Sequence, residues 1–84
     1  MKYEIIVQKR AEKFIEKLPM NEKRRIVEAL EALPFVGDIK ALKGHKDVFR
    51  LRVGDYRVIY TVDNGRFIIH VIDAGSRGQI YQNY

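Results

Sequence analysis

Five residues in the second half of the chain have side chains that suit chemistry on a phosphate group: Arg50, Arg52, Arg57, Arg77 and Tyr81. A guanidinium group can hold a phosphate through two parallel hydrogen bonds, and it stays charged at physiological pH. Such a set could stabilise the negative transition state of RNA cleavage by the RNA's own 2′-OH, which needs no metal. Arginine is a poor acid or base, so the proton transfers would fall to another group. Tyr81 could take that role, stack on a base, or simply pack on the sheet.

Other basic residues are candidates for binding RNA without taking part in the reaction. Lys43 and Lys46 lie in a basic segment, residues 35–46, which also contains two glycines and is predicted to be a loop. His70 could carry a proton, but a single histidine within a strand more often has a structural role. We assign these three residues, Lys43, Lys46 and His70, to RNA binding, together with Arg50 from the first set.

The composition excludes several other kinds of site. The chain has no cysteine and only two histidines, so a zinc site is not expected. Its acidic residues are scattered singly, and no glycine-rich phosphate loop precedes a helix. We therefore predict no metal and no other cofactor. The net charge of +5 favours an acidic partner such as a nucleic acid. No apolar run approaches the ~20 residues that span a membrane, and the lack of cysteine fits the cytoplasm.

Two turn signals predict how the strands that carry the arginines pair. Gly54-Asp55 fits a type II′ turn and Asn64-Gly65 fits a type I′ turn, each with a loop of two residues. The first turn would place Val53 opposite Tyr56, Arg52 opposite Arg57, and Arg50 opposite Ile59. The second would place Asp63 opposite Arg66, Ile59 opposite His70, and Arg57 opposite Ile72.

Side chains alternate between the two faces of a strand, so this register separates an apolar face from an arginine face. The apolar face contains Phe49, Leu51, Val53, Tyr56, Val58, Tyr60, Val62, Phe67, Ile69 and Val71. The arginine face contains Val48, Arg50, Arg52, Arg57, Ile59, Thr61, Ile68, His70 and Ile72. Like charges directly opposite each other destabilise a hairpin, so a bound anion shared by Arg52 and Arg57 would explain their pairing. Alternatively, the arginines extend into solvent or pair with acidic residues of a loop.

The first half of the chain predicts the elements that cover this sheet. Residues 2–8 alternate as a strand, and residues 9–18 change to helical spacing, with Ala11, Phe14, Ile15 and Leu18 on one side. A second helix, Glu22 to Leu33, has Asn21 as its expected N-cap and Ile26, Ala29, Leu30 and Leu33 as its inner stripe. The two helices form a hairpin that can cover one face only, which leaves the arginine face open or covered by another molecule. We therefore predict one α+β domain over residues 1–84, in the order β-α-α-β-β-β. A helical hairpin packs on one face of its antiparallel meander.

The chain resembles the RelE/ParE superfamily of toxins from bacterial and archaeal toxin–antitoxin pairs. The strongest match is ALKGHKDVFRLRVGDYRVIY, which is similar to the superfamily pattern L-x-G followed by [YF]-R-[LIV]-R-x-G-x-[YF]-R-[LIV]-[LIV]-Y. The closing AGSRGQIY resembles the superfamily ending of a glycine, an arginine and a late tyrosine. The resemblance covers nearly the whole chain.

This resemblance implies a function for the arginine face. RelE-type toxins are ribosome-dependent mRNA endonucleases that cut mRNA in the ribosomal A site and are neutralised by a cognate antitoxin. The resemblance places their sheet lysines at Arg50 and Arg52, the arginine of the next strand at Arg57, and the late arginine and tyrosine at Arg77 and Tyr81. The exchange of both lysines for arginine removes an acid or base of the lysine type. Catalysis is then assigned to Arg52, Arg57, Arg77 and Tyr81.

The strand motif also leaves two other functions open. ParE-type toxins share the core strands but inhibit DNA gyrase and have no nuclease activity. An inactive homologue that binds only RNA or an antitoxin is the third possibility. Arg77 and Tyr81 favour the RelE-type function, and a cognate antitoxin is expected for either class of toxin.

Overall fold

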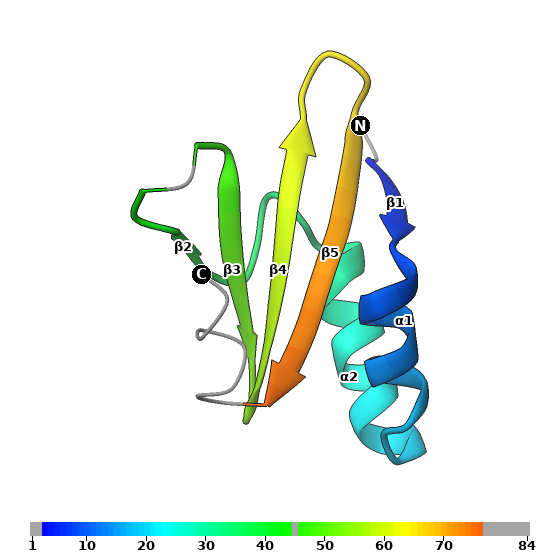
Figure 1. Cartoon of the computed structure of the whole chain (residues 1–84). Helices are drawn as coiled ribbons and strands as arrows, with labels where there is room; N and C mark the ends of the chain where they lie inside the picture. The colour runs from blue at the N-terminus through cyan, green and yellow to red at the C-terminus, as the bar shows by residue number, and fades with distance from the viewer. Residues whose placement is uncertain (1–2, 45, 77–84) are drawn as a thin grey trace.

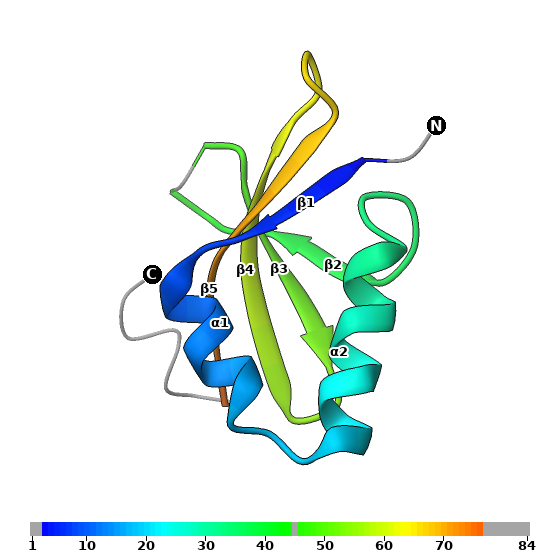
Figure 2. The same cartoon turned by 90° about the vertical axis from the view of Figure 1, so that its right-hand side faces the viewer.

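The computed structural model describes residues 3–44 and 46–76. Its elements follow the chain as two helices and five strands: β1 (Glu4–Val7), α1 (Lys9–Glu16), α2 (Met20–Glu31), β2 (Asp38–Ala41), β3 (Val48–Val53), β4 (Tyr56–Asp63) and β5 (Ile68–Ser76). All five strands form one sheet, in the order β1-β5-β4-β3-β2. Both helices lie on the same side of this sheet (Figures 1 and 2). The α+β class and the helical hairpin on one face are confirmed.

The sheet differs from the sequence prediction at both of its edges. The meander β3-β4-β5 is antiparallel as expected, but β1 joins it by pairing parallel to β5. Strand β2 lies within the segment that we predicted to be a loop, and it pairs antiparallel to β3. Its DIKA sequence is short and charged, so it has little of the apolar alternation by which a strand is recognised. No helix in the described part of the chain is long and apolar enough to cross a membrane.

The helices bury the stripes that the sequence predicted. Ala11 and Ile15 of α1, together with Ile26 and Leu30 of α2 and the nearby Leu33, are at most 6% exposed and pack on the sheet. Among the described residues, this packing leaves the opposite face of the sheet without a helix (Figure 2).

The expected N-cap of α2 was wrong. The helix begins at Met20 with Pro19 in the capping position, so Asn21 lies within its first turn. The carbonyl of Pro19 accepts hydrogen bonds from the backbone N–H groups of Glu22 and Lys23, at 3.1 and 2.9 Å. Proline is well suited to this end of a helix because its restricted φ is compatible with the entry to the helix.

The first hairpin has the predicted register. Val53 pairs with Tyr56, Arg52 with Arg57, and Arg50 with Ile59. Gly54 has a φ of 59°, the positive value that the first loop position of a type II′ turn requires. The three arginines of the two strands therefore share one face of the sheet, as predicted.

The second hairpin does not have the predicted register, since Asp63 pairs with Ile68 and the loop has four residues, 64–67. The carboxylate of Asp63 accepts the backbone N–H of Arg66 at 3.1 Å, and Phe67 takes a φ of 56°. This side-chain turn competes with the tight Asn-Gly turn. It also places Phe67, which was predicted for the core, in the loop with 41% of its surface exposed.

A bulge in β5 then changes which side chains reach the arginine face. Tyr60 pairs with Val71, but the preceding Ile59 pairs with Asp73, so Ile72 is the extra residue. An extra residue reverses the alternation beyond it. Asp73 therefore lies on the arginine face, and Gly75, not Ile72, is opposite Arg57.

Candidate anion site on the arginine face

The arginine face, defined by Arg50, Arg52 and Arg57, is built from two rows of residues that cross the sheet. One row runs Asp38–Arg52–Arg57–Gly75 and the next runs Lys40–Arg50–Ile59–Asp73, each across β2, β3, β4 and β5. Four of these eight positions are basic and two are acidic. The register thus gathers charges that are far apart in the sequence.

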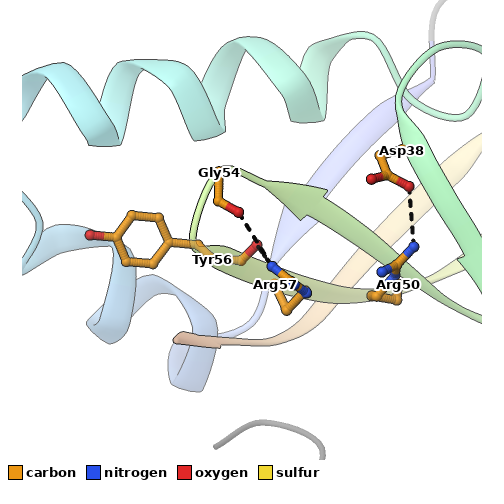
Figure 3. A network of polar contacts seen from close by, with 5 residues as sticks. All are labelled: Asp38, Arg50, Gly54, Tyr56 and Arg57. Carbon is orange, nitrogen blue, oxygen red and sulfur yellow. Dashed lines mark hydrogen bonds and ion pairs between the residues drawn. The ribbon is translucent and has the colours of Figure 1, made fainter. Parts of the chain in front are cut away.

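Arg57, the cross-strand neighbour of Arg52, is hydrogen-bonded to the backbone of the β3–β4 turn. Its Nη1 donates to the carbonyl oxygens of Tyr56, at 3.2 Å, and of Gly54, at 3.4 Å (Figure 3). The side chain thus lies along the β3–β4 turn, which eases the repulsion between the two like charges. Arg57 is 4% exposed, whereas Arg52 is exposed.

Arg50 has an acidic partner. Its Nη2 lies 3.2 Å from Oδ1 of Asp38, which is directly opposite Arg52 on β2 (Figure 3). The side chain of Asp38 is 58% exposed, so this ion pair is largely solvated and weak. The alternative in which an arginine pairs with an acid is therefore realised for Arg50, with the acid in a strand that the sequence did not reveal.

The arginine face holds every unpartnered buried side-chain polar atom found in residues 3–44 and 46–76. These atoms are Nε of Arg50, Nε of Arg57 and Oδ2 of Asp73. They lie around Ile59, which is fully buried, so the arginine face is not open at its centre. Buried polar groups are nearly always paired, so a cluster of exceptions calls for an explanation such as a catalytic role, a bound water or a bound ion.

Asp73 is the residue that sequence reasoning missed. It is 4% exposed, and its Oδ1 accepts the backbone N–H of Ala74 at 2.9 Å and lies 3.4 Å from Nε of Arg10. With two-residue turns and no bulge, it would have pointed to the apolar face. A lone acid in the mostly apolar run IIHVIDAG was the available signal, since an acid in such a run is costly to bury without a partner.

The remaining predicted residues fall into two groups. Lys43 and Lys46 are exposed in the segment that joins the edge strand β2 to β3. His70 is half-buried and pairs with Thr61 on the arginine face, one row beyond Ile59. Arg77 and Tyr81 lie outside the described residues.

The tyrosines of β4 are poor candidates for a base. The hydroxyl of Tyr56 donates to Glu22 at 2.6 Å, and this hydrogen bond, with burial and the nearby acids, raises the pKa of Tyr56. Burial raises the pKa of Tyr60 to about 12. Both phenols therefore stay protonated near neutral pH, and neither can accept a proton there.

The chemistry that fits these groups is recognition of an anion. Two guanidinium Nε–H groups lack acceptors, and one carboxylate oxygen lacks a donor. The described residues contain no group of three or more histidine, aspartate or glutamate side chains that could hold a metal ion. A ligand matched to the face would bring acceptors for the arginines and at least one hydrogen-bond donor for Asp73.

Comparison with known proteins places the chain in a family. Residues 5–81 match the model of the ParE toxin of the type II toxin–antitoxin system parDE. RelE1 of Methanocaldococcus jannaschii is 34% identical, and the match covers 99% of both chains.

Solved structures of similar fold carry the RelE name. A chain of the archaeal RelE–RelB complex from Pyrococcus horikoshii is 31% identical, with a TM-score of 0.79 and coverage of 94% of this chain and 99% of that one. The free Escherichia coli toxin RelE, in a variant with two arginines replaced by alanine, is 25% identical, with a TM-score of 0.75. The match covers 98% of this chain and 93% of that one. ParE and RelE share the strand motif, so the two names describe branches of one superfamily. The chain belongs to the RelE/ParE superfamily and is a toxin of the type II toxin–antitoxin class.

Proposed function

We propose that this toxin is a metal-independent, ribosome-dependent mRNA endonuclease. The observation that supports this function best is the cluster of unpartnered atoms on the arginine face, Nε of Arg50 and Arg57 with Oδ2 of Asp73. A nucleotide offers what these atoms lack, because its phosphate accepts hydrogen bonds and its ribose and base donate them. The four nearby basic positions favour RNA over a neutral ligand.

In this proposal the arginines stabilise negative charge and do not transfer protons. Attack of the 2′-oxygen on phosphorus forms a cyclic phosphate and releases the 5′-oxygen, and charge builds up on the phosphorus oxygens. Arg52, Arg57 and Arg77 stabilise that charge, which is usually the largest contribution to catalysis. Tyr81 takes the 2′-OH proton as a phenolate, the ionised form that nearby cations favour, and water protonates the leaving oxygen.

Other residues bind the RNA on either side of the bond that is cut. Arg50, Lys43, Lys46 and His70 hold the backbone through charge and hydrogen bonds, without discrimination between bases. The substrate is mRNA in the ribosomal A site, in the cytoplasm. The regulatory partner is a cognate antitoxin, consistent with the RelE–RelB complexes of similar proteins.

Inhibition of DNA gyrase is the second candidate function. It is favoured by the match of residues 5–81 to the ParE toxin model. In that case the arginine face would bind an acidic surface of a protein, and no bond in RNA would be broken.

A short induction of the toxin in cells separates the two functions. RNA ends are mapped genome-wide within minutes, and plasmid supercoiling is measured in the same culture. The endonuclease predicts discrete cuts inside translated frames with unchanged supercoiling. Intact mRNA with loss of negative supercoiling would replace this proposal with gyrase inhibition.

A further inference from the structure

The guanidinium group of Arg57 is held by the backbone of one turn. Its Nη1 donates to the carbonyl oxygens of Tyr56, at 3.2 Å, and of Gly54, at 3.4 Å, while its Nε has no partner among the described residues. The position of the guanidinium on the arginine face therefore depends on where the turn between β3 and β4 places these two carbonyl groups.

Tyr56 joins this turn to both helices. Consecutive side chains of a strand point to opposite faces, so the ring of Tyr56 points away from Arg57 (Figure 3). On the helix side of the sheet, its hydroxyl donates to Oε2 of Glu22 in α2 at 2.6 Å. Its ring meets the ring of Phe14 in α1 edge to face, with 5.8 Å between the ring centroids. One side chain thus connects the turn to α1 and α2.

Gly54 is also confined by α2. The guanidinium group of Arg25 lies so close that a Cβ atom added to Gly54 would come within 3.2 Å of its Nη2. Gly54 has a φ of 59° as well, a conformation that a residue with a side chain rarely adopts. Both residues whose carbonyl groups hold Arg57 therefore lie against the same helix.

The hydrogen bond between Tyr56 and Glu22 is suited to holding the turn in place. A hydroxyl that donates to a carboxylate makes a shorter and stronger hydrogen bond than one that donates to a neutral acceptor, and 2.6 Å is a short distance. This hydrogen bond is also the largest cause of the raised pKa of Tyr56, so the phenol keeps its proton and continues to donate near neutral pH. Because it lies on the helix side of the sheet, it does not touch a ligand on the arginine face.

We propose that the hydrogen bond between Tyr56 and Glu22 is a clamp that positions Arg57 for the cleavage reaction. The clamp holds the β3–β4 turn against α2, and the turn holds the guanidinium group where negative charge develops. Tyr56 and Glu22 are positioning residues, which act on the reaction only through Arg57. The effect on cleavage rests on the proposed function, whereas the effect of the clamp on Arg57 is measurable in the toxin alone.

The first test is single-turnover cleavage of ribosome-bound mRNA by the purified full-length toxin. Tyr56→Phe removes only the hydroxyl and should lower the maximal rate about tenfold at an unchanged half-saturating concentration, because a small displacement of an oriented group is costly in the transition state. Glu22→Ala should have the same effect, and Glu22→Gln should recover most of the rate, since its amide oxygen can accept the hydrogen bond. Tyr3→Phe is the matched control. It also loses one tyrosine hydrogen bond, to Asn64 at 2.8 Å, and should cleave at the natural rate.

Two further measurements show whether the clamp acts through Arg57. In a protein that already carries Arg57→Met, the addition of Tyr56→Phe should not slow cleavage further, because residues that act through one group are not additive. In NMR spectra of the toxin without RNA, the Nε–H signal of Arg57 is assigned by its loss in Arg57→Met. This N–H should exchange with solvent at least tenfold faster in Tyr56→Phe than in Tyr3→Phe.

The outcomes separate the clamp from the proposed function. Equal cleavage rates for Tyr56→Phe and Tyr3→Phe would overturn the inference. So would a Tyr56→Phe change that slows the Arg57→Met protein as much as the natural one, since that is the mark of a purely structural role. If the toxin cuts no mRNA, the proposed function fails, and equal exchange of the Arg57 Nε–H in the two tyrosine variants would then overturn the clamp. Should Tyr56→Phe not fold, Glu22→Ala takes its place in each comparison.

Discussion

Replacing Arg57 with methionine should separate folding from function. Methionine keeps most of the side-chain volume and removes the charge. Arg57 is 4% exposed, its Nη1 makes two hydrogen bonds at 3.2 and 3.4 Å, and its Nε has no partner among the described residues. A residue kept only for stability would be expected to satisfy all of its donors in such a buried place.

The effect on stability can be bounded from these contacts. The two carbonyl hydrogen bonds are each worth about 0.5–1.5 kcal/mol, so their loss costs about 1–3 kcal/mol. Removal of the unpartnered, buried Nε–H recovers a desolvation cost of about 1–3 kcal/mol. The two effects offset each other to within about 2 kcal/mol, and apolar replacements of buried charges are often neutral or stabilising. We therefore expect the free energy of unfolding of Arg57→Met to lie within about 2 kcal/mol of that of the natural protein.

The expected loss of function is much larger than this change in stability. If Arg57 stabilises the transition state, its removal should slow cleavage by on the order of 10²–10³. The assays are urea unfolding and single-turnover cleavage of ribosome-bound mRNA by the purified toxin. Leu51→Ala serves as the opposite control: Leu51 is fully buried in the core, so this variant should lose about 2–5 kcal/mol of stability. An Arg57→Met protein that is destabilised by several kcal/mol and cleaves at the natural rate would refute the reasoning.

Three further predictions address other residues. The affinity for single-stranded RNA should fall with salt, and Arg52→Ala should flatten the log–log slope by about 0.7, the contribution of one phosphate contact; an unchanged slope would mean that Arg52 does not touch the backbone. Arg77→Ala should slow cleavage by on the order of 10²–10³. If Tyr81 is the base, Tyr81→Phe should slow cleavage about 10²-fold or more while RNA binding stays intact. A Tyr81→Phe protein that cleaves at nearly the natural rate would leave Tyr81 with only a stacking role. Because burial raises the pKa of Tyr60 to about 12, its stabilising effect is complete below pH ~10, the pKa of a free tyrosine, and is lost as the pH rises towards 12. Urea unfolding between these pH values should show a decline that Tyr60→Phe reduces; an equal decline in both proteins would contradict this.

The local signals in the sequence were sufficient for the first hairpin and for the apolar stripes of the helices. Gly54 adopts the positive φ that its turn needs, so the pairing of Arg52 with Arg57 follows from the sequence alone. The stripes that contain Ile15 and Ile26 were likewise visible from their spacing, because a helix needs one apolar side to pack on a sheet.

The second hairpin could not be predicted from its turn residues. Asn64-Gly65 favours a tight turn, but the carboxylate of Asp63 stabilises a wider one by accepting the N–H of Arg66. The bulge at Ile72, opposite the step from Ile59 to Tyr60, is a feature of the pairing between β4 and β5, which no local pattern encodes. For the same reason the position of Asp73 beside the arginines was not visible from the sequence, and neither was the partner of Arg50.

In the proposed reaction, the toxin uses the RNA's own 2′-OH to cut mRNA on the ribosome. The most direct measurement takes ribosome-bound mRNA, maps the cut made by the purified toxin, and repeats the reaction with one 2′-deoxynucleotide on the 5′ side of that cut. We predict that the unmodified mRNA gives a 2′,3′-cyclic phosphate and a 5′-hydroxyl end, and that the single deoxy substitution abolishes this cut. Cleavage that continues at the deoxy position, or no cleavage of either mRNA, would contradict the account.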